Sequence, residues 1–133
     1  MNSERRKYPR VVLGGEASIL LAGVVRNGGL MNVSPSGIQI ECQHNVIEHL
    51  SRHKSDSGQY PDFEFEFALP NGGSSEMSIK AVCKVSYCRR QRQALYHLGL
   101  SFLKLSEKDE KTLDAYIGES AGGLDIKDKQ SVL

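Results

Sequence analysis

The chain has no tryptophan and no long apolar run, and its first residues are polar. No apolar stretch approaches the roughly 20 residues that a membrane-spanning helix needs, so we expect no membrane span. Residues 1–6 lack the apolar centre of a secretory signal peptide. These absences predict a cytoplasmic protein.

Cysteine is scarce and shows no pattern typical of disulfides. Cys42, Cys83 and Cys88 are odd in number and irregular in spacing. Cys42 and Cys83 lie in strand-like apolar segments. We therefore expect reduced, buried thiols that pack as small hydrophobic groups.

Motifs of several large enzyme classes are also missing. The sequence contains no Gly-x-Ser-x-Gly, no His-Glu-x-x-His and no phosphate-binding P-loop. His49 and His53 are four residues apart, as two metal ligands on one helical face would be, but no further ligand at tight spacing completes a set. We expect no enzymatic activity, no metal and no cofactor.

The composition is that of an ordinary globular protein, with 39% hydrophobic and 25% charged residues. A length of 133 residues fits one domain. The net charge is only +1, but the basic residues gather in two places. The clusters are Arg5, Arg6, Lys7 and Arg10, and Arg89, Arg90 and Arg92. Two local clusters on a nearly neutral chain favour a compact anionic ligand over DNA or RNA, which would select a basic face across the domain.

Alternating apolar and polar residues predict about six short β-strands. The strongest signal is residues 63–69, where three phenylalanines alternate with two glutamates. The other strand-like segments are 17–21, 24–25, 30–33, 38–42, 79–87 and 96–102. Turn signals stand at 26–29, 34–37, 70–73 and 89–93, and 43–61 is expected to be mostly loop with at most a short helical turn.

One helix is predicted near the C-terminus. Ser106 is a suitable N-cap with Asp109 at the third helical position, and Gly118 is expected to end the helix. Strands of this number with one late helix predict an all-β, six-stranded antiparallel barrel, because closure removes exposed strand edges. We expect a flexible ligand-binding arm at 1–10, the barrel and helix at 11–120, and a disordered tail at 121–133.

The arm carries a basic cluster suited to nucleotide phosphates. Arginine presents a planar fork of donors that fits phosphate oxygens and also the O6 and N7 acceptors of guanine. Arg6 and Arg10 are four residues apart and face the same way in an extended segment, while Arg5 faces the other way. The alternative is an ordinary solvated basic terminus.

A second polar motif follows at residues 32–37. Asn32 and Ser34 alternate onto one face, where an amide and a hydroxyl can meet a purine edge. Gly37 allows either a positive φ angle or the close approach of a ligand. An ordinary turn between two strands explains these residues equally well.

Taken together, the two motifs resemble the PilZ family. That family carries an Arg-x-x-x-Arg segment before its barrel and an Asp/Asn-x-Ser-x-x-Gly turn some way downstream. Arg6 to Arg10 and Asn32 to Gly37 match both in order. Residues 85–89 and 96–102 also resemble the family's later strands, so the likeness covers about 4–118.

The resemblance implies a bacterial PilZ-type barrel that binds cyclic di-GMP and relays the signal to a partner protein. By this analogy Arg6 and Arg10 grip phosphates and a guanine edge, and Asn32 and Ser34 bind the guanine beside Gly37. Arg5 is a basic residue directly before the Arg-x-x-x-Arg motif, and by the same analogy this implies two stacked ligand molecules. Tyr87 occupies the position of an aromatic residue that stacks on a base. A role in the barrel wall explains Tyr87 equally well. Motility and biofilm control are what the family implies in general.

One residue departs from the commoner pattern, because many relatives carry aspartate where this chain has Asn32. A neutral amide makes weaker hydrogen bonds than a carboxylate, so we expect lower affinity rather than loss of binding.

Two other readings compete with the receptor hypothesis. A PilZ-like adaptor that works without nucleotide is disfavoured because the motif residues are all present. A barrel that binds single-stranded nucleic acid is disfavoured because its strands should interleave basic and aromatic residues, whereas Glu64 and Glu66 occupy the clearest strand here.

Overall fold

The structure is a computed structural model that describes residues 10–70 and 76–132, with side chains for 10–70 and 77–120. In chain order the elements are β1 (Val11–Val12), β2 (Glu16–Leu21), β3 (Val24–Ser34), β4 (Gly37–Gln43), α2 (His44–Ser51), β5 (Phe63–Pro70), β6 (Glu76–Arg92), β7 (Leu95–Leu105) and α3 (Glu107–Val132).

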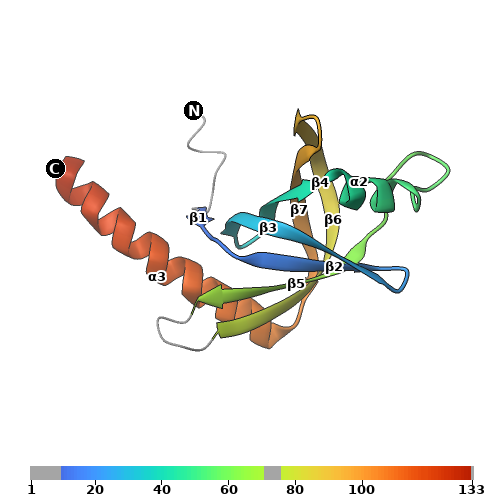
Figure 1. The fold of residues 1–133 in the computed structure, drawn as a ribbon. Coiled ribbons are helices and arrows are strands. Elements are labelled where there is room, and N and C mark those ends of the chain that lie inside the picture. Colours follow the sequence, from blue (N-terminus) through green and yellow to red (C-terminus); the bar gives the residue numbers. More distant parts are fainter. Residues whose placement is uncertain (1–9, 71–75, 133) are drawn as a thin grey trace.

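Strands β2 to β7 form a closed, six-stranded antiparallel barrel (Figure 1). The barrel closes at β3, whose first half pairs with β2 and whose second half pairs with β4. Gly29 marks the change, because it faces Glu16 on β2 and Glu41 on β4. The short strand β1 pairs with the end of β3, with Val11 opposite Val33. The predicted fold class is confirmed.

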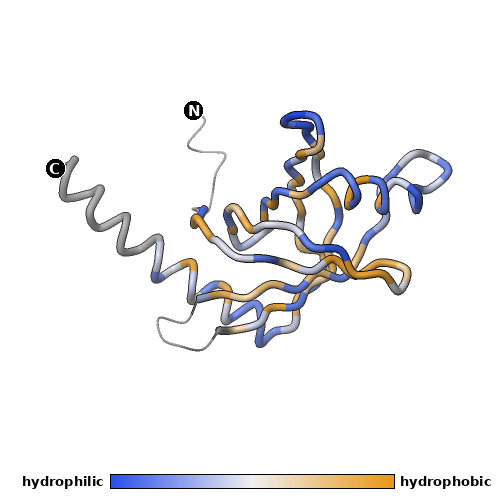
Figure 2. The backbone as a smooth tube through the Cα atoms, in the orientation of Figure 1, coloured by the Kyte–Doolittle hydropathy of each residue, from blue (hydrophilic) through white to orange (hydrophobic). Residues whose placement is uncertain are grey.

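The barrel interior is filled by the inward residues of the alternating strands. Phe63, Phe65 and Phe67 are each at most 3% exposed, as the phenylalanine pattern predicted. The Phe67 ring stacks on Phe102 at an interplanar angle of 4°. Figure 2 shows the same alternation as a change of hydropathy along the strands.

The glycine-rich segment 26–29 does not form the turn that the sequence predicted. The β2–β3 turn lies earlier, at Ala22 and Gly23, whose φ angles are 54° and 78°. Alanine seldom adopts a positive φ, so the sequence carried no signal for this turn. The glycines instead serve a crowded point in β3, where a Cβ atom on Gly28 would lie 3.0 Å from Ile40 Cδ1.

A second predicted turn, at 89–93, is also misplaced. Strand β6 continues to Arg92, and the turn is formed by Gln93 and Ala94. Polar, arginine-rich sequence can extend as a strand here because β7 pairs with it, for example Arg89 with His97. Pairing with a neighbour overrides weak local preference.

Helix α2 lies within the segment expected to be mostly loop. It buries Val46, Ile47 and Leu50, and its His49 is only 5% exposed with Nε2 3.0 Å from the carbonyl oxygen of Leu21. The helix covers the end of the barrel where β7 begins (Figure 1). An apolar spacing of three and four residues was the signal, obscured by the polar residues around it.

Helix α3 covers the other end of the barrel. Its N-cap is as predicted, since the Asp109 N–H donates to Ser106 Oγ at 3.0 Å. Leu113 and Ile117 are buried. Gly118 does not end the helix, because glycine weakens a helix by about 1 kcal/mol but keeps its backbone hydrogen bond.

The division of the chain into arm, barrel and tail stays a prediction. Residues 1–9 and the side chains beyond Ser120 lie outside the described part of the chain. Among the helices of that described part, none combines the length and the hydropathy needed to cross a membrane.

Candidate functional site

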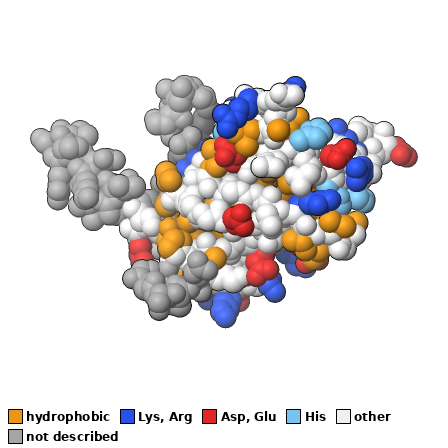
Figure 3. Space-filling view, in the orientation of Figure 1, with side chains coloured by type: hydrophobic (Ala, Val, Ile, Leu, Met, Phe, Trp, Pro, Cys, Tyr) orange, Lys and Arg blue, Asp and Glu red, His pale blue; other side chains and the backbone are white. Residues whose placement is uncertain are grey.

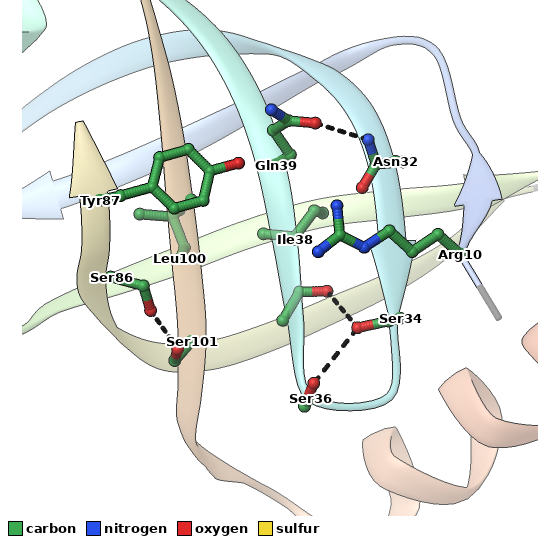
Figure 4. Close-up of a pocket in the computed structure, with 12 residues that line it drawn as sticks. Arg10, Asn32, Ser34, Ser36, Ile38, Gln39, Ser86, Tyr87, Leu100 and Ser101 are labelled. Atoms are coloured by element: carbon green, nitrogen blue, oxygen red, sulfur yellow. Dashed lines mark hydrogen bonds between the residues drawn. The ribbon is translucent and has the colours of Figure 1, made fainter. Parts of the chain in front are cut away.

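A pocket of about 140 Å³ opens on the outer wall of the barrel. It draws on three separate parts of the chain, namely Arg10 before β1, the β3–β4 turn, and facing segments of β6 and β7 (Figure 4). Arg10 is the one charged residue among the described residues that line it. An isolated guanidinium among neutral polar groups favours an anionic, hydrogen-bonding ligand.

Arg10 reaches the pocket because of the short strand β1. The two residues of β1 pair with β3, with Val11 opposite Val33 and Val12 opposite Asn32. This antiparallel register carries the preceding Arg10 towards Ser34, on the outward face. Figure 4 shows its guanidinium turned towards Asn32. Sequence spacing alone could not supply this pairing.

One part of the pocket wall is a row of outward residues across four strands. Asn32 on β3 is opposite Gln39 on β4, Gln39 is opposite Gly99 on β7, and Gly99 is opposite Tyr87 on β6. We call these four residues the site row. The row places the predicted Asn32 and Tyr87 on one surface, with Gln39 and Gly99 between them.

Tyr87 lies over the glycine of the site row. A Cβ atom on Gly99 would overlap the Tyr87 ring, so the ring rests directly against the β7 backbone. The Arg89 guanidinium also lies 4.9 Å from the centre of the Tyr87 ring, within the range of a cation–π contact. Gly99 therefore makes room for an aromatic surface beside the pocket.

The β3–β4 turn is held by its own polar groups and by β7. Ser34 Oγ lies 3.4 Å from the Gly37 carbonyl oxygen and 3.3 Å from Ser36 Oγ. Gly37 does not have a positive φ, so that alternative for its role is wrong. A Cβ atom there would overlap the Leu100 carbonyl oxygen, and the glycine is needed for the close approach of β7.

The amide of Asn32 has a defined partner. Its Nδ2 donates to Gln39 Oε1 at 2.7 Å, and both residues are half-buried. The bond uses the NH2 end of Asn32 and leaves its carbonyl oxygen available to the pocket. Carbonyl oxygens accept hydrogen bonds, so this end suits a donor on a ligand.

Five predicted site residues meet in this pocket: Arg10, Asn32, Ser34, Gly37 and Tyr87. Arg5 and Arg6 lie outside the described residues. Gln39, Ser86, Gly99 and Ser101 also line the pocket and were not predicted. Strand alternation places Gln39 outward beside Asn32, whereas Ser86 sits at an irregularity of β6 where it hydrogen-bonds Ser101, which no sequence pattern indicates.

On the face shown in Figure 3, acidic and basic side chains are interspersed. In the described part of the chain, no three or more His, Cys, Asp or Glu residues are grouped as metal ligands would be. The paired histidines have structural contacts, since His53 Nδ1 lies 3.1 Å from the His49 carbonyl oxygen.

The PilZ domain family matches residues 4–119, and the chain belongs to that family. Among curated proteins no match was found.

Solved structures agree on the fold. The inhibitor of motility MotI/DgrA of Bacillus subtilis aligns with a TM-score of 0.63 at 16% identity, over 85% of this chain and 49% of that one. PlzA of Borreliella burgdorferi, solved in complex with c-di-GMP, gives 0.54 at 14% identity over 89% and 55%. The PilZ domain of YcgR from Escherichia coli, solved with c-di-GMP, gives 0.53 at 14% identity over 94% and 98%. The chain thus spans about half the length of the first two.

Proposed function

We propose that this chain is a receptor for cyclic di-GMP that works by binding rather than by catalysis. The observation that carries the proposal is the meeting of Arg10, Asn32, Ser34 and Tyr87 in one pocket, although they are far apart in the sequence. Two of the structural relatives were solved with c-di-GMP, which supports the choice of ligand.

Each residue suits one part of a guanine nucleotide. The Arg10 fork can pair with a phosphate or with guanine O6 and N7. The Asn32 carbonyl oxygen can accept from the guanine N1–H and N2–H2 groups, with Ser34 beside it. The Tyr87 ring can stack on a base, a contact worth about 1–3 kcal/mol in nucleic-acid complexes.

The size of the pocket supports a role for the arm. Its volume of about 140 Å³ is below the roughly 300–1,000 Å³ of pockets that enclose a whole small molecule. One guanine edge occupies it, and the rest of the ligand lies on the outer wall. We propose that Arg5 and Arg6 close over this part and that Arg5 favours two stacked ligand molecules.

The signal then passes to a partner protein through the ordered arm. A ligand shifts a conformational equilibrium only if it binds one state better than the other. Here cyclic di-GMP binds the state in which the arm covers the pocket, and the partner recognises that surface.

Isothermal titration calorimetry with cyclic di-GMP tests the receptor proposal. We expect saturable binding and a ratio of two ligands per chain. Cyclic di-AMP is the control, because adenine has neither the O6 acceptor nor the N1–H donor, and we expect it to bind far more weakly.

Absence of binding at tens of micromolar by the folded protein would overturn the receptor proposal. The adaptor reading would then stand, and partner capture by this chain would be independent of nucleotide. A ratio of one ligand per chain would overturn only the proposed role of Arg5.

A further inference from the structure

An asparagine must hold its side-chain amide in one particular orientation to recognise guanine, whereas an aspartate need not. The two ends of an amide have opposite hydrogen-bonding character, since the oxygen accepts and the NH2 group donates. The guanine N1–H and N2–H2 groups are donors, so only the oxygen end of Asn32 can bind them. Both ends of a carboxylate accept, and its rotation by 180° changes nothing.

Gln39 provides a hydrogen-bond partner for the amide of Asn32. It is the direct cross-strand neighbour of Asn32 on the outward face of β4. Asn32 Nδ2 donates to Gln39 Oε1 at 2.7 Å, a normal length for a hydrogen bond. Both side chains are half-buried, where solvent competes less for the bond.

Gln39 could pair with either end of the Asn32 amide, and Arg10 decides between the two orientations. Figure 4 shows its guanidinium turned towards Asn32, with Gln39 beyond. A cation stabilises the carbonyl end of an amide dipole and repels the NH2 end. The NH2 group therefore points to Gln39 and the oxygen faces the pocket.

We propose that Gln39 is a positioning residue that holds the amide of Asn32 with its oxygen towards the guanine edge. The proposal rests on the proposed function, because its purpose is ligand recognition. It explains how a neutral residue can serve at a position where a carboxylate would need no such partner.

The test is a double-mutant cycle read by cyclic di-GMP affinity. Gln39→Leu removes the acceptor, and we expect binding to weaken by about tenfold, as for the loss of one hydrogen bond. In the Asn32→Asp background the same change is expected to cost less than about twofold, because the carboxylate needs no orientation. Gln39→Glu keeps an acceptor and is expected to keep most of the affinity.

Gln43→Leu is the matched control. Gln43 lies on the same strand and the same outward face but does not line the pocket, so its replacement should leave the affinity unchanged. Thermal unfolding of every variant checks that the fold is retained. An equal loss for Gln39→Leu in both backgrounds, or no loss in either, would overturn the positioning role.

A measurement without ligand separates this proposal from the receptor proposal. In ¹H–¹⁵N spectra of the free protein, Gln39→Leu should shift the side-chain NH2 signals of Asn32, and Gln43→Leu should not. Shifted signals in a protein that binds no cyclic di-GMP would overturn the receptor proposal, and with it the purpose of the contact. Unshifted signals in a protein that does bind would overturn the role of Gln39 alone.

Discussion

Two walls of the same barrel carry different outward faces. The site wall consists of β3, β4, β7 and the second half of β6, and its outward surface includes the neutral site row with Arg10 at its edge. The back wall consists of β2, β5 and the first half of β6. Its outward residues include Glu64 and Glu66, and Ser78 Oγ donates to Glu66 Oε2 at 2.8 Å.

The inward faces of the two walls are alike, because both supply buried apolar side chains such as Ile40 and Phe65. Period-2 alternation lets a strand stabilise the core with one face while the other face is free to vary. Stability is therefore assigned to the inward positions of both walls, and the proposed recognition of the ligand to outward positions of one wall.

The largest expected effect is on an inward position of the back wall. Phe65→Ala removes a 2% exposed ring packed against Phe63 and Phe67, and we expect a loss of about 3–5 kcal/mol in the free energy of unfolding. Chemical denaturation measures this. Glu64 is the neighbouring residue on the strand and faces outward, so Glu64→Ala should change the free energy of unfolding by less than about 0.5 kcal/mol. A loss as large as that of Phe65→Ala would contradict the difference between inward and outward positions.

Arg10→Ala tests the opposite case, an outward position of the site wall. Arg10 is exposed, so stability should be unchanged, while loss of charged hydrogen bonds should weaken cyclic di-GMP binding by about 10- to 100-fold. Calorimetry gives the affinity. Arg92→Ala is the matched control, because Arg92 is an exposed arginine that does not line the pocket. Equal effects of the two changes would show that only overall charge matters.

Gly99→Ala sharpens the comparison within the site row. The added methyl group overlaps the Tyr87 ring and must displace it, and we expect binding to weaken by up to the stacking contribution of about 1–3 kcal/mol. In the Tyr87→Ala background the same substitution should cost little further affinity. An undiminished loss in that background would mean that Gly99 acts on the strand pairing instead.

The smallest effect near neutral pH concerns a buried thiol. Burial raises the pKa of Cys83 from 9.0 to about 12. The fold thus favours the protonated thiol, and this stabilisation is complete below pH 9.0 and is lost as the pH rises towards 12. Between about pH 8 and pH 10.5 the wild type should lose more stability than Cys83→Ala, and parallel losses in denaturation curves would contradict this cause.

Strand alternation made much of the fold predictable. The phenylalanine pattern fixed the inward face of β5, and the Ser106 cap marked the start of α3. Glycines misled the prediction at 26–29, because a glycine can serve close packing as well as a turn. Which of the two applies depends on a neighbour that lies elsewhere in the sequence, here Ile40.

The candidate site was predictable by residue type but not by geometry. Arginine and the Asn-x-Ser-x-x-Gly turn have recognisable chemistry, so Arg10, Asn32 and Ser34 could be chosen. Gln39 and Gly99 are ordinary residues whose roles arise from cross-strand registers. No local pattern indicates such a register, because it is set by pairing between distant segments.

The sequence by itself determined which faces of the strands are apolar, where the basic residues lie along the chain, and which side chains have hydrogen-bonding groups suited to guanine. Only the tertiary structure decided that β1 brings Arg10 to the β3–β4 turn and that Asn32, Gln39, Gly99 and Tyr87 form one row. The physical reason is that alternation is a local property of each strand, whereas the neighbours of an outward side chain are fixed by closure of the whole barrel.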